Sequence, residues 1–92
     1  MENRDKRLEE AVGYMVRGVA SRPDEVEVSQ ATSPRGLIVR VRIAERDKGR
    51  IIGRQGRNIQ AMRALLAAGA QALGVPPGDN QPTIELDEAE RG

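Results

Sequence analysis

Apolar residues near the N-terminus recur three or four positions apart, which is the spacing of one face of an α-helix. Charged side chains fill the positions between them early in this segment. The pattern ends at Arg22-Pro23-Asp24, because a proline disfavours helical backbone at the residue before it. We therefore predict an amphipathic helix over residues 5–20. Its apolar face consists of Leu8, Ala11, Val12, Met15, Val16 and Val19.

The next two segments alternate apolar and polar residues, the pattern of strands with one buried face. In the first, Val26 and Val28 alternate with Glu25 and Glu27. Residues 32–36, Thr-Ser-Pro-Arg-Gly, have turn chemistry, so we predict an antiparallel hairpin whose apolar face the helices cover. In its second strand one side is formed by Leu37, Val39, Val41 and Ile43, and the other by Ile38, Arg40 and Arg42.

The second half of the chain predicts two helices and a final strand. Residues 45–52 allow about two helical turns, with acids first and cations later, the order that complements a helix dipole. Residues 53–56 interrupt the pattern, which resumes at Arg57 and closes at Gly74 and Pro76-Pro77. A polar loop at 78–81 precedes a short strand at 83–86. The long helix has one apolar face, made of Ile59, Met62, Leu66, Ala70 and Leu73.

This order of elements predicts the fold class. Two helices between residues 37–43 and 83–86 leave enough chain for a right-handed crossover, so the last strand should lie parallel to the second. We expect an α+β fold of order α-β-β-α-α-β, with a three-stranded mixed sheet and helices on one face. A chain of 92 residues has room for one core, so we expect a single domain over residues 1–87 and an acidic flexible tail at 88–92.

Composition excludes several classes of function. The chain has no His and no Cys, which removes the commonest zinc ligands, disulfides and nucleophile–base pairs. The acids lie mainly in polar runs at the two ends, where a solvated surface is expected, so we predict no enzyme, metal or cofactor. No stretch approaches the roughly 20 apolar residues of a membrane span, and residues 1–7 lack a signal-peptide core. We expect a cytoplasmic protein.

The formal net charge of +1 conceals an asymmetry. Residues 46–63 contain six cations and one acid, a net charge of +5, whereas residues 79–92 contain five acids and one cation, a net charge of −4. A ligand meets the local field rather than the net charge. The basic segment is therefore where an anionic partner is expected.

The basic segment contains a glycine-bounded turn, since residues 49–59 read Gly-Arg-Ile-Ile-Gly-Arg-Gln-Gly-Arg-Asn-Ile. Gly53 and Gly56 permit positive φ and close backbone approach between two helices. Amides at the start of the next helix attract anions, and Arg54 and Arg57 add full charges, so a phosphodiester fits. The pattern is also compatible with a plain corner between two helices. Three isoleucines flank it and are expected to line an apolar groove for unstacked bases: Ile51, Ile52 and Ile59.

Residues 51–59 resemble the signature of KH domains, in which an apolar pair precedes GxxG and an aliphatic residue follows three positions later. Residues 49–66 resemble the stand-alone bacterial KhpA family of RNA-binding proteins, also called the YlqC family, and the similarity extends over about residues 5–87. This resemblance implies a type II KH-like fold, RNA binding through the GxxG loop (residues 53–56), and a role as an RNA chaperone or post-transcriptional regulator. Arg50 and Arg54 stand where family members tend to have Lys, which changes donor geometry.

The expected partner is single-stranded RNA, with bases of about four nucleotides held between the helix pair and the sheet. With one aromatic residue the binding should be weak and modestly selective, and RRM and cold-shock folds are disfavoured because they depend on stacking. We expect Arg40 and Arg42 to be solvated, and Tyr14 to lie at a helix edge or interface. The predicted RNA-binding residues are Lys48, Arg50, Ile51, Ile52, Gly53, Arg54, Gln55, Gly56, Arg57, Ile59 and Arg63.

Two other hypotheses remain open. The first is an adaptor or assembly protein, since the small residues of the Ala-rich helix from Arg57 to Leu73 permit close helix approach. The family resemblance implies a homodimer, or a heterodimer with a KH protein of the KhpB type, also called Jag or EloR. The second is a helix–turn–helix DNA-binding protein, which would prefer duplex DNA to single-stranded RNA.

Overall fold

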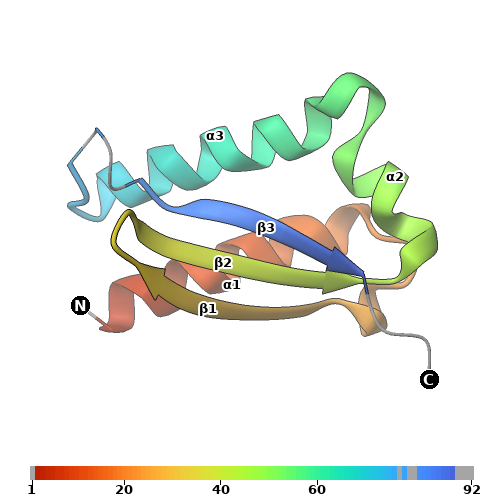
Figure 1. The fold of residues 1–92 in the computed structure, drawn as a ribbon, viewed down its shortest axis with the longest axis horizontal. Coiled ribbons are helices and arrows are strands. Elements are labelled where there is room, and N and C mark those ends of the chain that lie inside the picture. Colours follow the sequence, from red (N-terminus) through yellow and green to blue (C-terminus); the bar gives the residue numbers. More distant parts are fainter. Residues whose placement is uncertain (1, 77, 79–80, 89–92) are drawn as a thin grey trace.

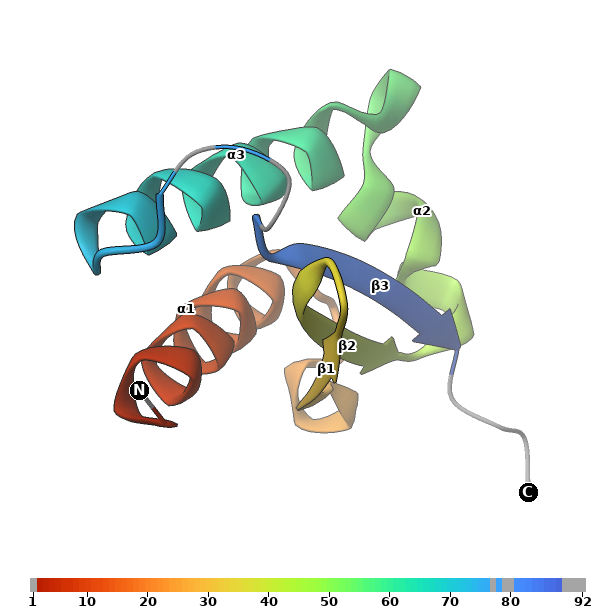
Figure 2. The same cartoon turned by 60° about the vertical axis from the view of Figure 1, so that its left-hand side comes forward.

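The computed structural model describes residues 2–76, 78 and 81–88, and in these residues three helices lie on one face of a three-stranded sheet (Figures 1 and 2). The element order confirms the predicted α-β-β-α-α-β arrangement. Short 3-10 turns precede β1 (Pro23–Glu25) and α2 (Glu45–Asp47), and a third joins α2 to α3 (Arg54–Gly56). The helices and strands are α1 (Glu2–Val19), β1 (Glu27–Ser33), β2 (Gly36–Ile43), α2 (Lys48–Ile52), α3 (Arg57–Ala72) and β3 (Thr83–Glu88).

The sheet has the order β1-β2-β3, so β2 is the central strand. It pairs antiparallel with β1 and parallel with β3, and Val39 lies between Gln30 of β1 and Ile84 of β3. The parallel pairing requires a crossover connection, which α2 and α3 supply. The predicted hairpin and the predicted parallel final strand are both confirmed.

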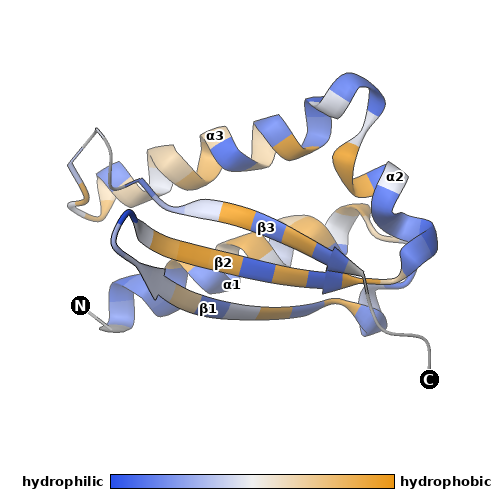
Figure 3. Cartoon of the chain, in the orientation of Figure 1, coloured by the Kyte–Doolittle hydropathy of each residue, from blue (hydrophilic) through white to orange (hydrophobic). Residues whose placement is uncertain are grey.

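The two faces of the sheet differ in polarity, as the alternating colours of β2 show (Figure 3). Val39 and Val41 are completely buried against the helices, because residues two apart in a strand share a face. On the opposite face Arg40 lies 3.4 Å from Glu85 of β3, and Arg42 lies 3.9 Å from a carboxylate of β1. Both arginines are exposed, as expected. The core consists of Leu8, Val12, Val16, Val26, Leu37, Val39, Val41, Ile43, Ile51, Ile59, Met62, Leu66, Ala70 and Ile84.

The first strand starts later than its alternating pattern predicts. Pro23 begins a 3-10 turn that takes up Glu25, and the Val26 N–H donates a 3.2 Å hydrogen bond to the Pro23 carbonyl. The Val26 side chain still enters the core. β1 therefore begins at Glu27, because Pro23 fixes the backbone of residues 23–25 in a turn just before the strand.

The last strand is longer than predicted. β3 extends to Glu88, which pairs with Ile43, so Glu88 belongs to the sheet rather than to a tail. The rest of the predicted tail, residues 89–92, lies outside the described residues. Among the helices that the structure describes, none combines the length and the apolar character needed to cross a bilayer.

Candidate nucleic-acid interface

The GxxG loop forms a tight corner between α2 and α3, at the upper right of Figure 1. Backbone φ is positive at Gly53 (80°), Gln55 (58°) and Gly56 (74°), which confirms the conformation predicted for both glycines. The Gly53 N–H donates to the Gly49 carbonyl at 2.8 Å, and the Gly56 N–H donates to the Gly53 carbonyl at 3.0 Å. Positive φ at a residue with a side chain, as at Gln55, is costly and is often found at binding sites.

The two glycines of the loop meet different physical requirements. A Cβ on Gly53 would lie 2.7 Å from Cγ and 2.9 Å from the backbone nitrogen of Asn58, so this position has no room for a side chain. A Cβ on Gly56 would have Gln60 Nε2, at 3.8 Å, as its nearest neighbour. Gly53 is therefore required for space and for its backbone angles, whereas Gly56 is required for its backbone angles alone. The space beside Gly56 is open.

Exposed cations lie on the loop and on the two helices that flank it. Arg54 is in the loop, Arg57 is the first residue of α3, and both are exposed, as is Gln55 between them. The Arg57 guanidinium donates a 3.5 Å hydrogen bond to Gln55 Oε1. Lys48 and Arg50 are exposed on α2. The structure thus brings five of the predicted polar site residues to one corner of the domain.

Arg63 lies apart from this corner, about two turns along α3. Its guanidinium Nη2 donates a 3.1 Å hydrogen bond to the carbonyl oxygen of Ile84. Because Ile84 belongs to the edge strand β3, this contact joins the long helix to the sheet.

The three isoleucines near the loop are placed at different depths. Ile51 has no exposed surface and Ile59 is 5% exposed, and both belong to the core. Ile52 is partly exposed and packs against the core from outside. Of the three, Ile52 offers the accessible apolar surface beside the loop, whereas Ile51 and Ile59 support the corner from beneath.

Comparison with known proteins places this fold and loop in a family. Residues 9–75 match the family model described as KhpA/KhpB, KH domain. This chain belongs to the KhpA/KhpB family. The element order and the mixed sheet fit the KH-like fold that the signature around residues 51–59 predicted.

Several relatives of this KhpA/KhpB chain are named RNA-binding protein KhpA. One from Leifsonia xyli subsp. xyli is 43% identical over 61 residues, which are 66% of this chain and 80% of that protein. One from Mycobacterium tuberculosis is 45% identical over 58 residues, 63% of this chain and 72% of the relative. One from Treponema pallidum is 39% identical over 64 residues, 70% and 80% of the two chains. These matches confirm the predicted resemblance.

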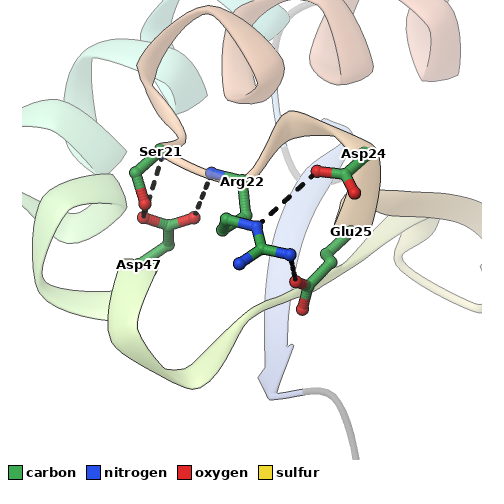
Figure 4. Close-up of polar contacts among 5 residues, drawn as sticks. All are labelled: Ser21, Arg22, Asp24, Glu25 and Asp47. Carbon is green, nitrogen blue, oxygen red and sulfur yellow. Dashed lines mark hydrogen bonds and ion pairs between the residues drawn. The ribbon is translucent and has the colours of Figure 1, made fainter.

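A buried carboxylate fixes the start of α2 in this KhpA/KhpB domain (Figure 4). Asp47, 1% exposed, accepts hydrogen bonds from the Ser21 hydroxyl at 2.6 Å and from the backbone N–H groups of Ser21 and Arg22, each at 3.0 Å. These bonds connect the end of α1 to the segment that leads into the loop. The sequence contained one signal for this role, because Asp47 is the lone acid between residues 46 and 63.

The hydrogen bonds at Asp47 also lower its pKa below the ordinary value. The Ser21 hydroxyl has the largest effect, and the two backbone N–H groups and the Arg50 cation, 3.8 Å away, act in the same direction. Burial acts in the opposite direction and raises the pKa, but the hydrogen bonds and the Arg50 cation together outweigh it, so the pKa of Asp47 is lowered. Asp47 is thus a buried anion beneath a cationic surface.

Asn58 is a second residue whose role the pattern did not reveal. Its side-chain Nδ2 donates a 2.9 Å hydrogen bond to the carbonyl oxygen of Arg50, in the last turn of α2. Asn58 lies in the first turn of α3, so this bond closes the base of the GxxG loop. The sequence contained one sign of this role. Asn58 has a side-chain N–H donor two residues after Gly56, close enough along the chain to reach the end of α2.

Proposed function

We propose that this protein binds single-stranded RNA through the GxxG loop and the cations beside it. The observation that supports the proposal most strongly is the corner itself, where positive φ at Gly53 and Gly56 coincides with exposed Arg54 and Arg57. The relatives' name, RNA-binding protein KhpA, agrees with this reading.

A phosphodiester fits the open side of the corner. Apart from Gly56 and the residues next to it in the chain, the nearest heavy atom to a Cβ placed on Gly56 is Gln60 Nε2, at 3.8 Å, so a phosphate has room to approach the backbone there. The 16-residue helix α3 begins at Arg57, and its first amides and its dipole favour an anion at that end. Arg54 and Arg57 add full charges to the same place.

The bases of about four nucleotides would lie between the helix pair and the sheet. Ile52 would contribute the apolar contact, with Ile51 and Ile59 supporting it. Three or four phosphates would be neutralised by the cationic residues of this surface. Because Tyr14, on α1, is the single aromatic residue, base stacking on aromatic rings is absent from this site and the affinity should be modest. The proposed phosphate-binding residues are Lys48, Arg50, Arg54 and Arg57, together with Arg63 about two turns farther along α3.

We place the protein in the cytoplasm as an RNA chaperone or post-transcriptional regulator without catalytic activity. The decisive test compares a labelled single-stranded 12-nucleotide RNA with duplex DNA of the same sequence in fluorescence anisotropy. Tighter binding of the RNA supports the proposal, whereas preference for the duplex would support a helix–turn–helix DNA-binding protein. Crosslinking in cells, followed by sequencing of the bound RNA, would identify the targets.

A second function, assembly with another KH domain, is favoured by an apolar surface on α1 and α3. Leu65 of α3 is 61% exposed, a large value for an apolar side chain. Leu65 also borders a hollow of about 260 Å³ between the two helices. The hollow is lined by Met15, Val19, Asn58, Ala61, Met62 and Leu65.

The proposed occupant of this hollow is a second copy of the chain or a KH protein of the KhpB type. Sedimentation with and without RNA tests the idea, and a dimer that is unaffected by RNA would favour the adaptor role. Leu65→Asp should dissociate such a dimer, whereas Ala64→Asp, at an exposed position of the same helix, should not. A chain that stays monomeric at all concentrations and also fails to co-sediment with a KH protein of the KhpB type would contradict this second function.

A further inference from the structure

The conformation of the GxxG loop depends on α2, which is only five residues long. A helix of this length is unstable in isolation, so contacts with other parts of the chain must hold it in place. Asp47 provides such contacts at its N-terminal end. At its C-terminal end the corresponding contact is made by Asn58.

Asn58 contacts both sides of the loop. The chain leaves the helical path at Gly53, with φ 80° and ψ 170°, and the Asn58 amide donates to the carbonyl oxygen of Arg50 at 2.9 Å. The side chain of Asn58 also covers Gly53, since Cγ and Cβ of Asn58 fill the space that a Cβ on Gly53 would need. One side chain therefore fixes the end of α2, the first glycine of the loop and the first turn of α3 relative to one another.

We propose that Asn58 is a positioning residue that holds the GxxG loop in its RNA-binding conformation without contacting RNA itself. This inference rests on the proposed function and deepens it. The Asn58 bond adds to the two backbone hydrogen bonds of Gly53 and Gly56 that shape the corner carrying Arg50, Arg54 and Arg57. By restricting the backbone of this corner before RNA arrives, it reduces the ordering cost of binding.

The test measures binding of a labelled single-stranded 12-nucleotide RNA by fluorescence anisotropy. Asn58→Ala should weaken binding about three- to tenfold, the effect expected for loss of one hydrogen bond. The dependence of affinity on salt should not change, because the variant removes no charge. The matched control is Gln71→Ala, which truncates an exposed amide in the last turn of the same helix and should bind like the wild type.

A second variant separates the hydrogen bond from the shape of the side chain. Asn58→Asp keeps the shape, lacks the N–H donor and adds a negative charge beside the loop. It should bind RNA more weakly than Asn58→Ala at low salt, and the two variants should converge at high salt, where the added charge is screened. Asn58→Asp with wild-type affinity at high salt would overturn the proposal.

Amide hydrogen exchange of residues 53–57 in the free protein distinguishes positioning from direct contact. Asn58→Ala should increase this exchange, and Gln71→Ala should not. Weakened RNA binding with unchanged exchange would mean that Asn58 contacts RNA directly, and would overturn the positioning role. If the wild type does not bind RNA, the proposed function fails, and the exchange measurement still decides whether Asn58 holds the loop.

Discussion

The Ser21 hydroxyl donates a 2.6 Å hydrogen bond to the carboxylate of Asp47, across 26 positions of the sequence. Ser21 follows the end of α1, and Asp47 is the last residue before α2. The contact therefore links the N-terminal helix to the segment that carries the GxxG loop. A site that is built on a short helix needs this type of support, because the cations on it are useful only in a fixed arrangement.

Asp47→Asn should lower the melting temperature by several degrees. An amide has one acceptor oxygen, so its NH₂ group would face one of the three N–H and O–H donors that the carboxylate now satisfies. Asp24→Asn is the matched control, because the Asp24 side chain is 73% exposed and its ion pair with Arg22 is 3.8 Å long. Exposed ion pairs contribute little. Equal melting temperatures for both variants, measured by circular dichroism, would contradict the role given to Asp47.

The lowered pKa of Asp47 predicts how stability depends on pH. A carboxyl group whose pKa is lower in the folded protein contributes stability that is complete above its ordinary pKa, about 3.9 for Asp, and is lost as the pH falls towards the lowered value. The melting temperature of the wild type should therefore decrease more than that of Asp47→Asn between about pH 5 and pH 3. Parallel pH profiles of the two proteins would show that Asp47 makes no such contribution.

The fold was predictable from the sequence where burial has a regular period. Val39 and Val41 alternate along β2, and Ile59, Met62 and Leu66 recur along α3, so each element could be read from its own segment. The loop was also predictable, because the effect of Gly53 and Gly56 on the backbone is local.

The contacts that support the loop were not predictable in this way. The bond from Ser21 to Asp47 joins residues that no periodic pattern relates, and it forms only when α1 and α2 pack together. The bond from Asn58 to the Arg50 carbonyl depends on the direction in which Gly53 turns the chain. Long-range polar contacts can be identified only from the tertiary structure, whereas hydrophobic periodicity can be recognised in the sequence of a single segment.

Alanine substitutions at the two loop glycines should differ in cost. Gly56 has φ 74° and ψ 15°, the left-handed region that other residues can adopt at about 1–2 kcal/mol. Gly53 has φ 80° and ψ 170°, which is almost exclusive to glycine, and its added Cβ would collide with the backbone of Asn58. Gly53→Ala should destabilise the protein by about 1 kcal/mol more than Gly56→Ala in urea denaturation. Equal losses would mean that the corner relaxes around residue 53.

RNA affinity should fall with salt in proportion to the number of phosphate contacts. Three or four contacts to a single strand predict a slope of about −2 to −3 in a plot of log affinity against log salt concentration. Arg54→Ala should make the slope less steep by about 0.7, because one contact is lost. Arg40→Ala is the control, since Arg40 lies on the opposite face of the sheet and pairs with Glu85. A wild-type slope near zero would contradict an electrostatic mechanism.

Arg54→Asp combined with Gln55→Asp should nearly abolish RNA binding and leave the fold intact. Both side chains are exposed, and Asp tolerates the left-handed backbone of residue 55, so stability should change by no more than about 0.5 kcal/mol. The charge of the loop changes from +1 to −2 where a phosphate must approach the first amides of α3, and each new carboxylate also competes for those amides.

The matched control for this double variant is Arg35→Asp combined with Gln30→Asp, on the β1–β2 hairpin. It changes the net charge by the same amount at two exposed positions, Gln30 in β1 and Arg35 in the turn between β1 and β2, on elements that do not form the GxxG loop. A general effect of net charge would weaken both double variants equally, whereas a local site at the GxxG loop predicts loss in the first alone. Wild-type melting and wild-type affinity for Arg54→Asp/Gln55→Asp would show that the loop is only a corner between two helices. RNA binding, if present, would then have to occur on another surface of the KH-like fold.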